Sequence, residues 1–143
     1  MVIAIFGESC TGKSTLADAL REKLNAQVFT GKDYLRLHGS EQMAQRLFAK
    51  KLTEAVDGEH LIYVLTETEL LKLIPPGAFR ILVTEELDVI KERFAARMRG
   101  VLPPPVAAML ERRHGCFDNE PCDLHVHAGK PSAADVCELI LNR

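Results

Sequence analysis

The sequence predicts an α/β fold with three layers (α/β/α), in which a five-stranded parallel sheet lies between helices. Two observations lead to this prediction. Short apolar segments alternate with segments of helical length, and segments 2–6 and 61–65 are apolar throughout, which is typical of a parallel sheet covered on both faces. No repeat, low-complexity tract or linker divides the 143 residues, so residues 1–143 are expected to form a single domain.

The strands are predicted at residues 2–6, 27–29, 61–65, 79–84 and 124–126, joined by right-handed crossovers into a doubly wound sheet. Helices are predicted from residue 13, after Ser40, over 85–99 up to Gly100, over 106–114 up to Gly115, and after Ser132. Thr66 and Glu69 have the spacing of a capping box for a further short helix, which Pro75-Pro76-Gly77 would stop. Apolar residues at helical spacing support three of these helices: Leu16, Ala17, Leu20 and Leu24; Met43, Ala44, Leu47, Phe48 and Leu52; Val136, Leu139 and Ile140.

The composition is that of an ordinary globular protein, with 47% apolar and 27% charged residues and a formal charge of −2. This near-neutral charge argues against bulk binding of nucleic acid, and no apolar run is long enough to span a bilayer, so no membrane partner is expected. The 4 cysteines are irregularly spaced and no secretory signal is recognisable, which favours a reduced, cytoplasmic setting. The oligomeric state cannot be predicted.

The most specific motif is a glycine-rich stretch between the first predicted strand and the first predicted helix. It fits the pattern G-x-x-x-x-G-K-[ST] of a P-loop. Such a loop turns several backbone N–H groups toward one phosphate, at the positive end of the following helix. The alternative, a glycine turn with a chance lysine, does not explain the strand–loop–helix context. The predicted nucleotide-binding residues are Gly7, Glu8, Ser9, Cys10, Thr11, Gly12, Lys13, Ser14 and Thr15, with Lys13 on the outer phosphates and Ser14 in the Mg²⁺ shell.

With this motif and this order of elements, the chain resembles the nucleoside-monophosphate kinases (adenylate and cytidylate kinases) and shikimate kinases, which have the P-loop NTPase fold. The resemblance implies ATP and Mg²⁺ as cofactors. It extends to residues 30–36, Thr-Gly-Lys-Asp-Tyr-Leu-Arg, where those families contact the phosphate acceptor. On this resemblance Asp33 would meet an acceptor hydroxyl and Arg36 an acceptor phosphate. The alternative is a turn with a solvated arginine.

Arg93 and Arg97 form an R-x-x-x-R pair near the end of the helix predicted at 85–99. In the families it resembles, such a pair closes on the ATP phosphates, and the resemblance implies a short lid around residues 98–112. Like charges at positions i and i+4 repel, by roughly 0.2–0.5 kcal/mol, and an anion between them would offset this cost. A solvated basic helix end is the alternative. Arg112, which lies in a second basic cluster at 112–114, is a looser candidate for substrate binding.

Several features differ from adenylate kinases and leave the acceptor open. Only about 30 residues separate the second and third strands. The third strand is followed by Thr66 and Glu67 rather than by an aspartate that would hold magnesium waters, although Glu67 could substitute. The His and Cys residues of 114–127 are candidate zinc ligands, but their spacing is irregular, so surface histidines and ordinary thiols are expected instead. His125 and His127 should point to the same, polar face of their strand.

The sequence therefore predicts an ATP-dependent kinase that moves the γ-phosphate of Mg-ATP to a small acceptor, either a nucleoside monophosphate or a hydroxyl metabolite. Lys13, Asp33, Arg93 and Arg97 are the predicted catalytic residues. A regulatory or non-catalytic P-loop module that only binds nucleotide is the first alternative, favoured by the short acceptor region. An RNA-end kinase is the second, and the near-neutral charge argues against it.

Overall fold

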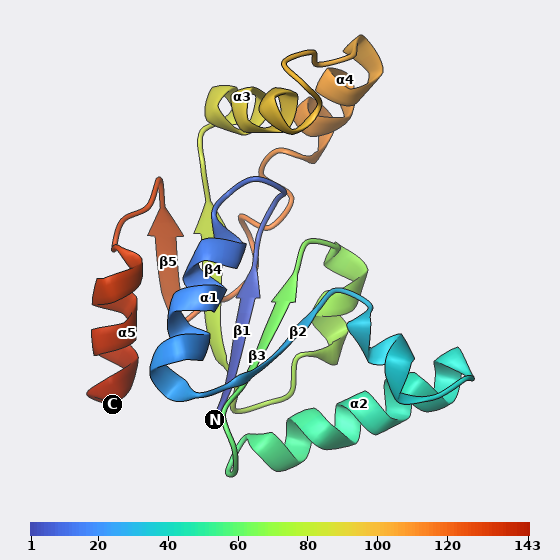
Figure 1. Cartoon of the computed structure of the whole chain (residues 1–143), viewed down its shortest axis with the longest axis vertical. Helices are drawn as coiled ribbons and strands as arrows, with labels where there is room; N and C mark the ends of the chain where they lie inside the picture. Colours follow the sequence, from blue (N-terminus) through green and yellow to red (C-terminus); the bar gives the residue numbers. More distant parts are fainter.

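The computed structural model describes all 143 residues as one five-stranded parallel sheet with helices on both faces (Figure 1). The strand order is β2-β3-β1-β4-β5, so β1 lies at the centre. The three-layer α/β fold predicted from the sequence is confirmed. Its elements are β1 (Val2–Phe6), α1 (Lys13–Leu24), β2 (Gln27–Thr30), the 3-10 helix η1 (Asp33–Leu37), α2 (Glu41–Ala55), β3 (Leu61–Leu65), the 3-10 helix η2 (Thr68–Leu73), β4 (Phe79–Thr84), α3 (Leu87–Arg97), α4 (Pro104–Arg113), β5 (Leu124–His127) and α5 (Ala133–Leu141).

The central strand β1 is fully buried because helices cover both faces of the sheet there, which explains why every one of its side chains is apolar. It pairs with β3 on one side and β4 on the other, with Ile3 opposite both Ile62 and Phe79. Alternate residues of β1 point to opposite faces, so Ile3 and Ile5 enter one core, whereas Ala4 and Phe6 enter the other.

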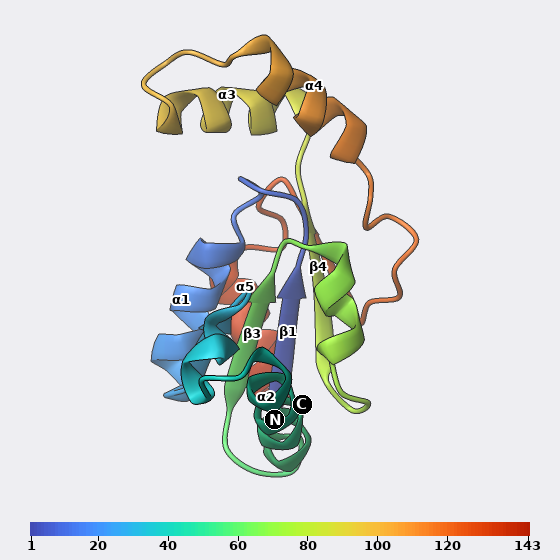
Figure 2. The same ribbon diagram turned by 90° about the vertical axis from the view of Figure 1, so that its right-hand side faces the viewer.

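The two cores occupy the two faces of the sheet (Figure 2). Helices α1 and α5 pack side by side over one face, burying Leu16 and Leu20 of α1 and Ile140 of α5 against the strands. Helix α2 and both 3-10 helices cover the other face, where Phe117 from the segment before β5 completes the layer.

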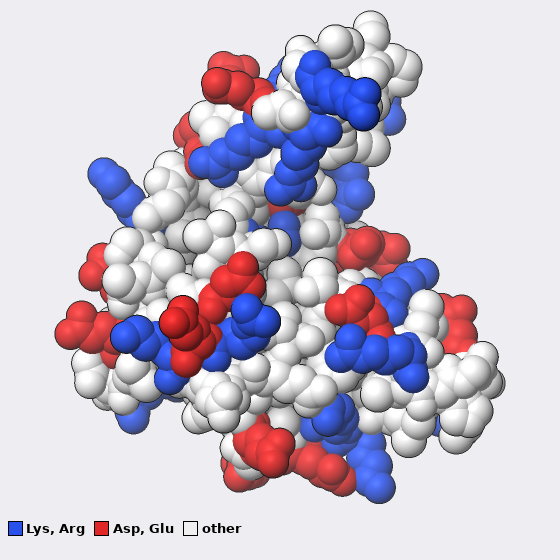
Figure 3. Space-filling view, viewed as in Figure 1, with Lys and Arg blue, Asp and Glu red and all other residues white.

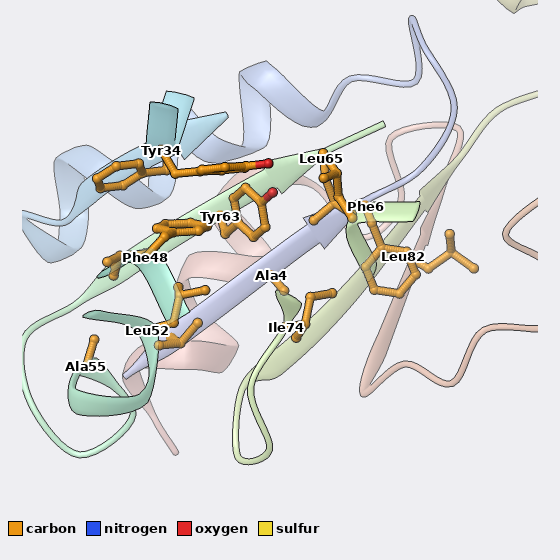
Figure 4. Packing of buried hydrophobic residues seen from close by; sticks show 14 of the residues in the cluster. Ala4, Phe6, Tyr34, Phe48, Leu52, Ala55, Tyr63, Leu65, Ile74 and Leu82 are labelled. Carbon is orange, nitrogen blue, oxygen red and sulfur yellow. The ribbon is translucent and has the colours of Figure 1, made fainter. Parts of the chain in front are cut away.

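An aromatic cluster fills the core beneath α2 (Figure 4). Phe48 stacks on Tyr34 of η1, with ring centroids 5.4 Å apart, and meets the edge of Tyr63 at 4.8 Å. Phe29 of β2 lies 4.9 Å from the same Phe48 ring. The Tyr63 hydroxyl donates to the Gly31 carbonyl at 2.8 Å, so the cluster also fixes the turn that follows β2.

Helices α3 and α4 form a hairpin beyond the carboxyl ends of the strands rather than over a face of the sheet (Figures 1 and 2). The two helices pack against each other, and Lys91 of α3 donates to the Glu111 carboxylate of α4. The return segment 114–123 then leads back to β5. The hairpin therefore covers the edge at which the glycine-rich loop leaves β1.

Three details differ from the sequence predictions. The capping box predicted at Thr66 is wrong: Glu67 is the N-terminal cap residue, no side chain makes a capping bond, and the segment is a 3-10 helix. Pro104 and Pro105 belong to α4, because the first turn of a helix does not need their missing N–H groups. Met43, Leu47 and Leu139, predicted on apolar stripes, are exposed, whereas Ala44, Phe48, Leu52 and Ala55 form the buried side of α2.

All four cysteines are free thiols, with Cys10 and Cys137 buried and the other two exposed. No helix combines the length and the apolar character needed to cross a membrane.

Candidate functional site

The glycine-rich loop lies where the sequence predicts it, between the end of β1 and the start of α1. Gly7 packs against the backbone of β4, and a Cβ atom at residue 7 would overlap the carbonyl oxygen of Val83. Cys10 (φ 64°) and Gly12 (φ 101°) both adopt left-handed backbone conformations that curl the loop back toward the helix. The curl is typical of loops whose amides converge on an anion.

The amino end of α1 lacks any side-chain cap, since Gly12 is the cap residue and has no side chain to accept from the first-turn amides. The first turn also contains no acidic residue that would offset the positive end of the helix dipole. Both features leave the amides of residues 13–15 available to a ligand, as expected for a loop that binds phosphate.

Lys13 is almost fully buried although it belongs to this loop, with 6% of its surface exposed. Its ammonium group donates to the Glu8 carbonyl, which also accepts from the Thr11 hydroxyl at 2.9 Å. Burial, with a smaller effect of the nearby positive charge of Arg97, lowers the pKa of Lys13 from 10.5 to about 8. An anion placed beside this group would reverse the effect of burial, because it would stabilise the charged form.

Two cavities are lined by residues 9–16, at the end of the loop and the start of α1. The larger, of about 350 Å³, lies between the loop, α3 and the segment after β5; the smaller, of about 160 Å³, lies toward β2 and β3. Cys10, Gly12, Thr15 and Arg97 line both cavities, so the loop separates them and Arg97 reaches across. The larger cavity is lined by Cys10, Thr11, Gly12, Thr15, Leu16, Val83, Glu85, Arg93, Arg97, Val126, Gly129, Pro131 and Ala133; the smaller by Ser9, Cys10, Gly12, Lys13, Ser14, Thr15, Thr30, Val64, Thr66 and Arg97.

The two arginines of α3 have different surroundings. Arg93 donates to the Cys10 carbonyl at 3.0 Å and lies 3.5 Å from the Glu85 carboxylate, which is buried. It therefore attaches α3 to the glycine-rich loop. Arg97, one turn further along, is exposed and forms no hydrogen bond or ion pair to protein, and it lines both cavities. Figure 3 shows basic side chains gathered around the hairpin above this region.

The acceptor candidates lie at the carboxyl end of β2. Asp33 accepts from the Thr30 amide at 2.9 Å, which holds its carboxylate beside a residue of the smaller cavity. Arg36 has its guanidinium 4.5 Å from the centroid of the Phe29 ring and lines neither of the two cavities. Asp33 also lines neither cavity, so the structure brings it beside a residue of the smaller cavity without placing it in the cavity wall.

Arg112 is exposed in the last turn of α4 and also lines neither cavity. Its neighbour Arg113 donates to the Thr66 carbonyl at 3.2 Å, at the rim of the smaller cavity. The basic run at 112–114 signals a charged helix end, but the sequence alone does not indicate which arginine faces the site. Glu85 has no sequence signal of its own. The signals at Thr30, in the run 30–36, and at Thr66, in the predicted capping box, do not indicate that either residue lines a cavity beside the loop.

His125 and His127 point to the same face of β5, as their alternation predicts. Nε2 of His125 and Nδ1 of His127 lie 2.6 Å and 2.7 Å from the hydroxyl oxygen of Thr84. No group of three or more His, Cys, Asp or Glu side chains is arranged to hold a metal ion. After β3, Glu67 has its carboxylate near Gly31 and close enough to Lys13 to raise the pKa of that lysine slightly against the effect of burial.

This arrangement of sheet, loop and helical hairpin recurs in solved structures along nearly the whole chain. Shikimate kinase from Acinetobacter baumannii in complex with shikimate matches with a TM-score of 0.66 and 13% identity, over 99% of this chain and 90% of that one. The fold is that of the small P-loop kinases.

Two further structures with this kinase fold are similar. A sugar kinase from Janibacter sp. HTCC2649 has a TM-score of 0.62 at 15% identity, covering 99% of this chain and 92% of its own. A gluconokinase from Sinorhizobium meliloti 1021 has a TM-score of 0.56 at 16% identity, with coverage of 99% and 89%. No family model and no curated protein matches the sequence. At these identities the likeness establishes the P-loop kinase fold, and function depends on the site.

Proposed function

We propose that this chain is an ATP-dependent phosphotransferase that moves the γ-phosphoryl group of ATP to a small-molecule acceptor. The observation that carries the proposal is the P-loop between two cavities, with the buried Lys13 in the loop and Arg97 lining both sides. A loop that only bound a phosphate would need neither the second cavity nor an arginine that bridges the two.

The larger cavity fits a base and ribose. Its walls combine apolar side chains with Glu85 and the exposed backbone of Gly129, and its volume of about 350 Å³ is within the range of small-ligand pockets. The triphosphate would then run along the amides of residues 10–15 toward the smaller cavity. There Lys13 would contact the outer phosphates once its ammonium group leaves the Glu8 carbonyl.

The residues beside the loop fit a magnesium ion, since Ser14 offers an exposed hydroxyl in the smaller cavity and Glu67 lies nearby as a carboxylate. Both are oxygen donors, and Mg²⁺ usually keeps several waters among its ligands. When bound with ATP, the ion would neutralise part of the charge on the phosphates.

Transfer would proceed by attack of an acceptor oxygen on the γ-phosphorus, with cleavage of the bond to the bridging oxygen and departure of ADP. Asp33 would orient an acceptor hydroxyl and take its proton, a role supported by the hydrogen bond that holds its carboxylate beside Thr30. If the acceptor is already a phosphate, no base is needed, and a basic residue such as Arg36 or Arg112 would have to approach it. Arg97 would stabilise the charge on the transferred group.

A nucleotide-binding module without transfer activity is the second candidate. The small volume on the acceptor side, about 160 Å³, and the absence of an aspartate directly after β3 favour it. The two candidates agree on the P-loop and differ only in whether ADP is produced.

One experiment separates them. The protein is incubated with Mg-ATP and a panel of nucleoside monophosphates and small hydroxyl metabolites, and ADP formation is measured. Stimulation of ADP formation by one class of acceptor supports the kinase, whereas ATP-dependent thermal stabilisation without turnover supports the binding module. Lys13→Ala should remove both ADP formation and thermal stabilisation by ATP. The matched control is Lys23→Ala, at the exposed end of the same helix, which should keep both. Unchanged stabilisation by ATP in Lys13→Ala would refute nucleotide binding at this loop.

A further inference from the structure

The second residue of the P-loop has a buried carboxylate whose contacts lie outside the phosphate site. Glu8 is 8% exposed, and its side chain lines neither cavity beside the loop. It enters a separate cavity of about 390 Å³ on the other side of the loop, which His114 also lines. The Glu8 carboxylate raises the pKa of Lys13 slightly against the effect of burial. Phosphate binding by a P-loop uses the backbone at such a position, so this small effect does not explain why the carboxylate is buried.

Both oxygens of this carboxylate contact the residues that end helix α4. Nδ1 of His114 lies 3.0 Å from Oε1 of Glu8, and the Gly115 amide donates to Oε2 at 3.1 Å. Burying a carboxylate costs free energy unless it is hydrogen-bonded, and these two contacts satisfy both of its oxygens. Glu8 is separated from His114 by 106 positions in the chain and from Gly115 by 107. The contacts are therefore a tertiary link between the P-loop and the hairpin.

The link fixes the backbone next to an arginine at the phosphate site. Arg113 immediately precedes the two residues that Glu8 holds, and its guanidinium donates to the Thr66 carbonyl at 3.2 Å. Thr66 lines the smaller cavity, where the proposed transfer would take place. A shift of residues 114–115 would therefore move the guanidinium of Arg113 relative to that cavity.

The hairpin has two other attachments to the loop, of which only the one through Leu110 comes from the last turn of α4. Beyond Gly115, the buried Phe117 packs on Phe6 of β1 and restrains the return segment from the other side. The Arg93 contact with the Cys10 carbonyl comes from the middle of α3, and the apolar contact of Cys10 with Ile90 and Leu110 comes from the inner faces of the two helices. The carboxyl end of α4 is exposed at residues 111–114 and leads into an irregular segment. Glu8 is the residue of the P-loop that holds it.

We propose that Glu8 is a positioning residue, which ties the carboxyl end of α4 to the P-loop and so holds Arg113 at the rim of the smaller cavity. The effect of Glu8 on catalysis through Arg113 rests on the proposed phosphotransfer. The attachment of α4 to the P-loop by Glu8 does not depend on it. Arg113 thereby becomes a substrate-contacting candidate in place of its neighbour Arg112.

The test compares Glu8→Ala, Arg113→Ala and the double variant in ADP formation with the best acceptor of the panel. If Glu8 acts through Arg113, Glu8→Ala should lower kcat about tenfold, as expected for a lost pair of charge-assisted bonds, with a smaller change in the KM for ATP. The double variant should be no slower than Arg113→Ala alone. Glu8→Gln should retain most of the rate, because its amide oxygen accepts from Gly115 and its amide NH₂ can donate to the other tautomer of His114.

Glu120→Ala is the matched control. Glu120 is a partly buried residue of the return segment 114–123. Its carboxylate lies 3.4 Å from the guanidinium of Arg80 in β4, so it pairs with the sheet and not with the P-loop. Its loss should leave kcat unchanged. Additive losses in the double variant, or an equal effect of Glu120→Ala, would overturn the action through Arg113.

A second readout does not need activity. Amide exchange of Gly115, followed by NMR in the full-length protein, should be protected in wild type and in Glu120→Ala and should become at least about tenfold faster in Glu8→Ala. Unchanged exchange would overturn the tie even in an active enzyme. Faster exchange in a protein that forms no ADP would support the tie and refute the proposed phosphotransfer and the action on substrate through Arg113.

Discussion

At the scale of single residues, Lys13 is the P-loop side chain whose charge is affected by burial. It is buried in the loop, donates to a backbone carbonyl and has its pKa lowered to about 8, chiefly by desolvation. The P-loop motif predicted that this lysine lies in the loop between β1 and α1, because the motif requires only local backbone and one lysine; its role on the phosphates stays a prediction. The motif could not predict the lowered pKa, which depends on burial by the fold and, to a smaller extent, on the charge of the distant Arg97.

This pKa predicts a pH dependence of nucleotide binding. In the unfolded chain Lys13 titrates near 10.5 and in the empty folded protein near 8, so between these pH values the folded protein has lost the proton that the unfolded chain keeps. Stability of the empty protein should rise across this window, since the cost of burying the charge disappears. Nucleotide binding requires the charged form, so its affinity should fall as pH rises above 8, by up to about tenfold per pH unit.

Thermal unfolding with and without ATP, from pH 7 to 10, measures both trends. Lys13→Arg is the control, because arginine keeps its charge over this range and should give a much flatter profile. An ATP-dependent shift that stays constant across the window in wild type would contradict the role assigned to this lysine.

Arg93 and Arg97 should behave differently on substitution. Arg97→Ala should lower kcat by about 10²–10³ with a small change in ATP affinity, because its proposed role is in the transition state. Arg93→Ala should instead lower the free energy of unfolding by about 1–3 kcal/mol, since it leaves the Cys10 carbonyl and the buried Glu85 without their partner. Steady-state kinetics and urea denaturation of both variants check this. Equal losses of kcat and affinity in Arg97→Ala would indicate plain ground-state binding.

At the scale of elements, the α3–α4 hairpin is attached to the P-loop through a small apolar cluster. Cys10, Ile90 and Leu110 are its buried members, contributed by the loop, α3 and α4 respectively. The sequence predicted both helices, with stops at Gly100 and Gly115, although α3 ends at Arg97, two residues before the predicted end. It could not predict that they lie beyond the sheet, because helical periodicity does not specify which surface a helix packs on.

Ile90→Ala should reduce the free energy of unfolding by about 2–5 kcal/mol if this cluster attaches the hairpin, because the side chain is buried and leaves a cavity. The measurement is urea denaturation followed by circular dichroism. Leu139→Ala, at an exposed position of α5, should change stability by less than about 0.5 kcal/mol. If Ile90→Ala lowered the free energy of unfolding by no more than Leu139→Ala does, the hairpin would be held by its polar contacts alone.

At the scale of the whole molecule, the order of elements and the parallel sheet were predictable because each strand is short, apolar and followed by a helix or turn signal. The strand order was expected only as a doubly wound sheet; pairing of β1 with both β3 and β4 follows from contacts between distant residues. In the candidate site the P-loop was predictable because its motif is local, whereas the part assigned to Asp33 stays a prediction. The tertiary parts of the site, such as the pairing of Glu8 with His114, join residues too far apart for any motif.

In the core beneath α2, we expect Phe48 to contribute more to the free energy of unfolding than any other side chain, because it contacts three aromatic rings. Phe48→Ala should cost about 3–5 kcal/mol in free energy of unfolding. Phe48→Leu should cost clearly less, since it keeps most of the apolar volume and loses mainly the ring contacts. Calorimetry of the two variants measures the difference. Equal losses would mean that ring geometry, rather than filled volume, holds this layer together.

The contact of Gly7 with the backbone of β4 has a consequence for how this protein can vary. The first residue of the loop is in contact with the main chain at Val83, so no side chain of any size fits there without moving a central strand. Saturation mutagenesis at residue 7 followed by selection for folded protein should therefore return glycine alone. At Gly12 an added Cβ atom would meet no other atom, but the backbone φ of 101° is strained for other residues, so glycine should predominate there too, with asparagine as its most frequent replacement. The anchoring point of the phosphate loop would thus be the least variable position in a library, before any ligand is added.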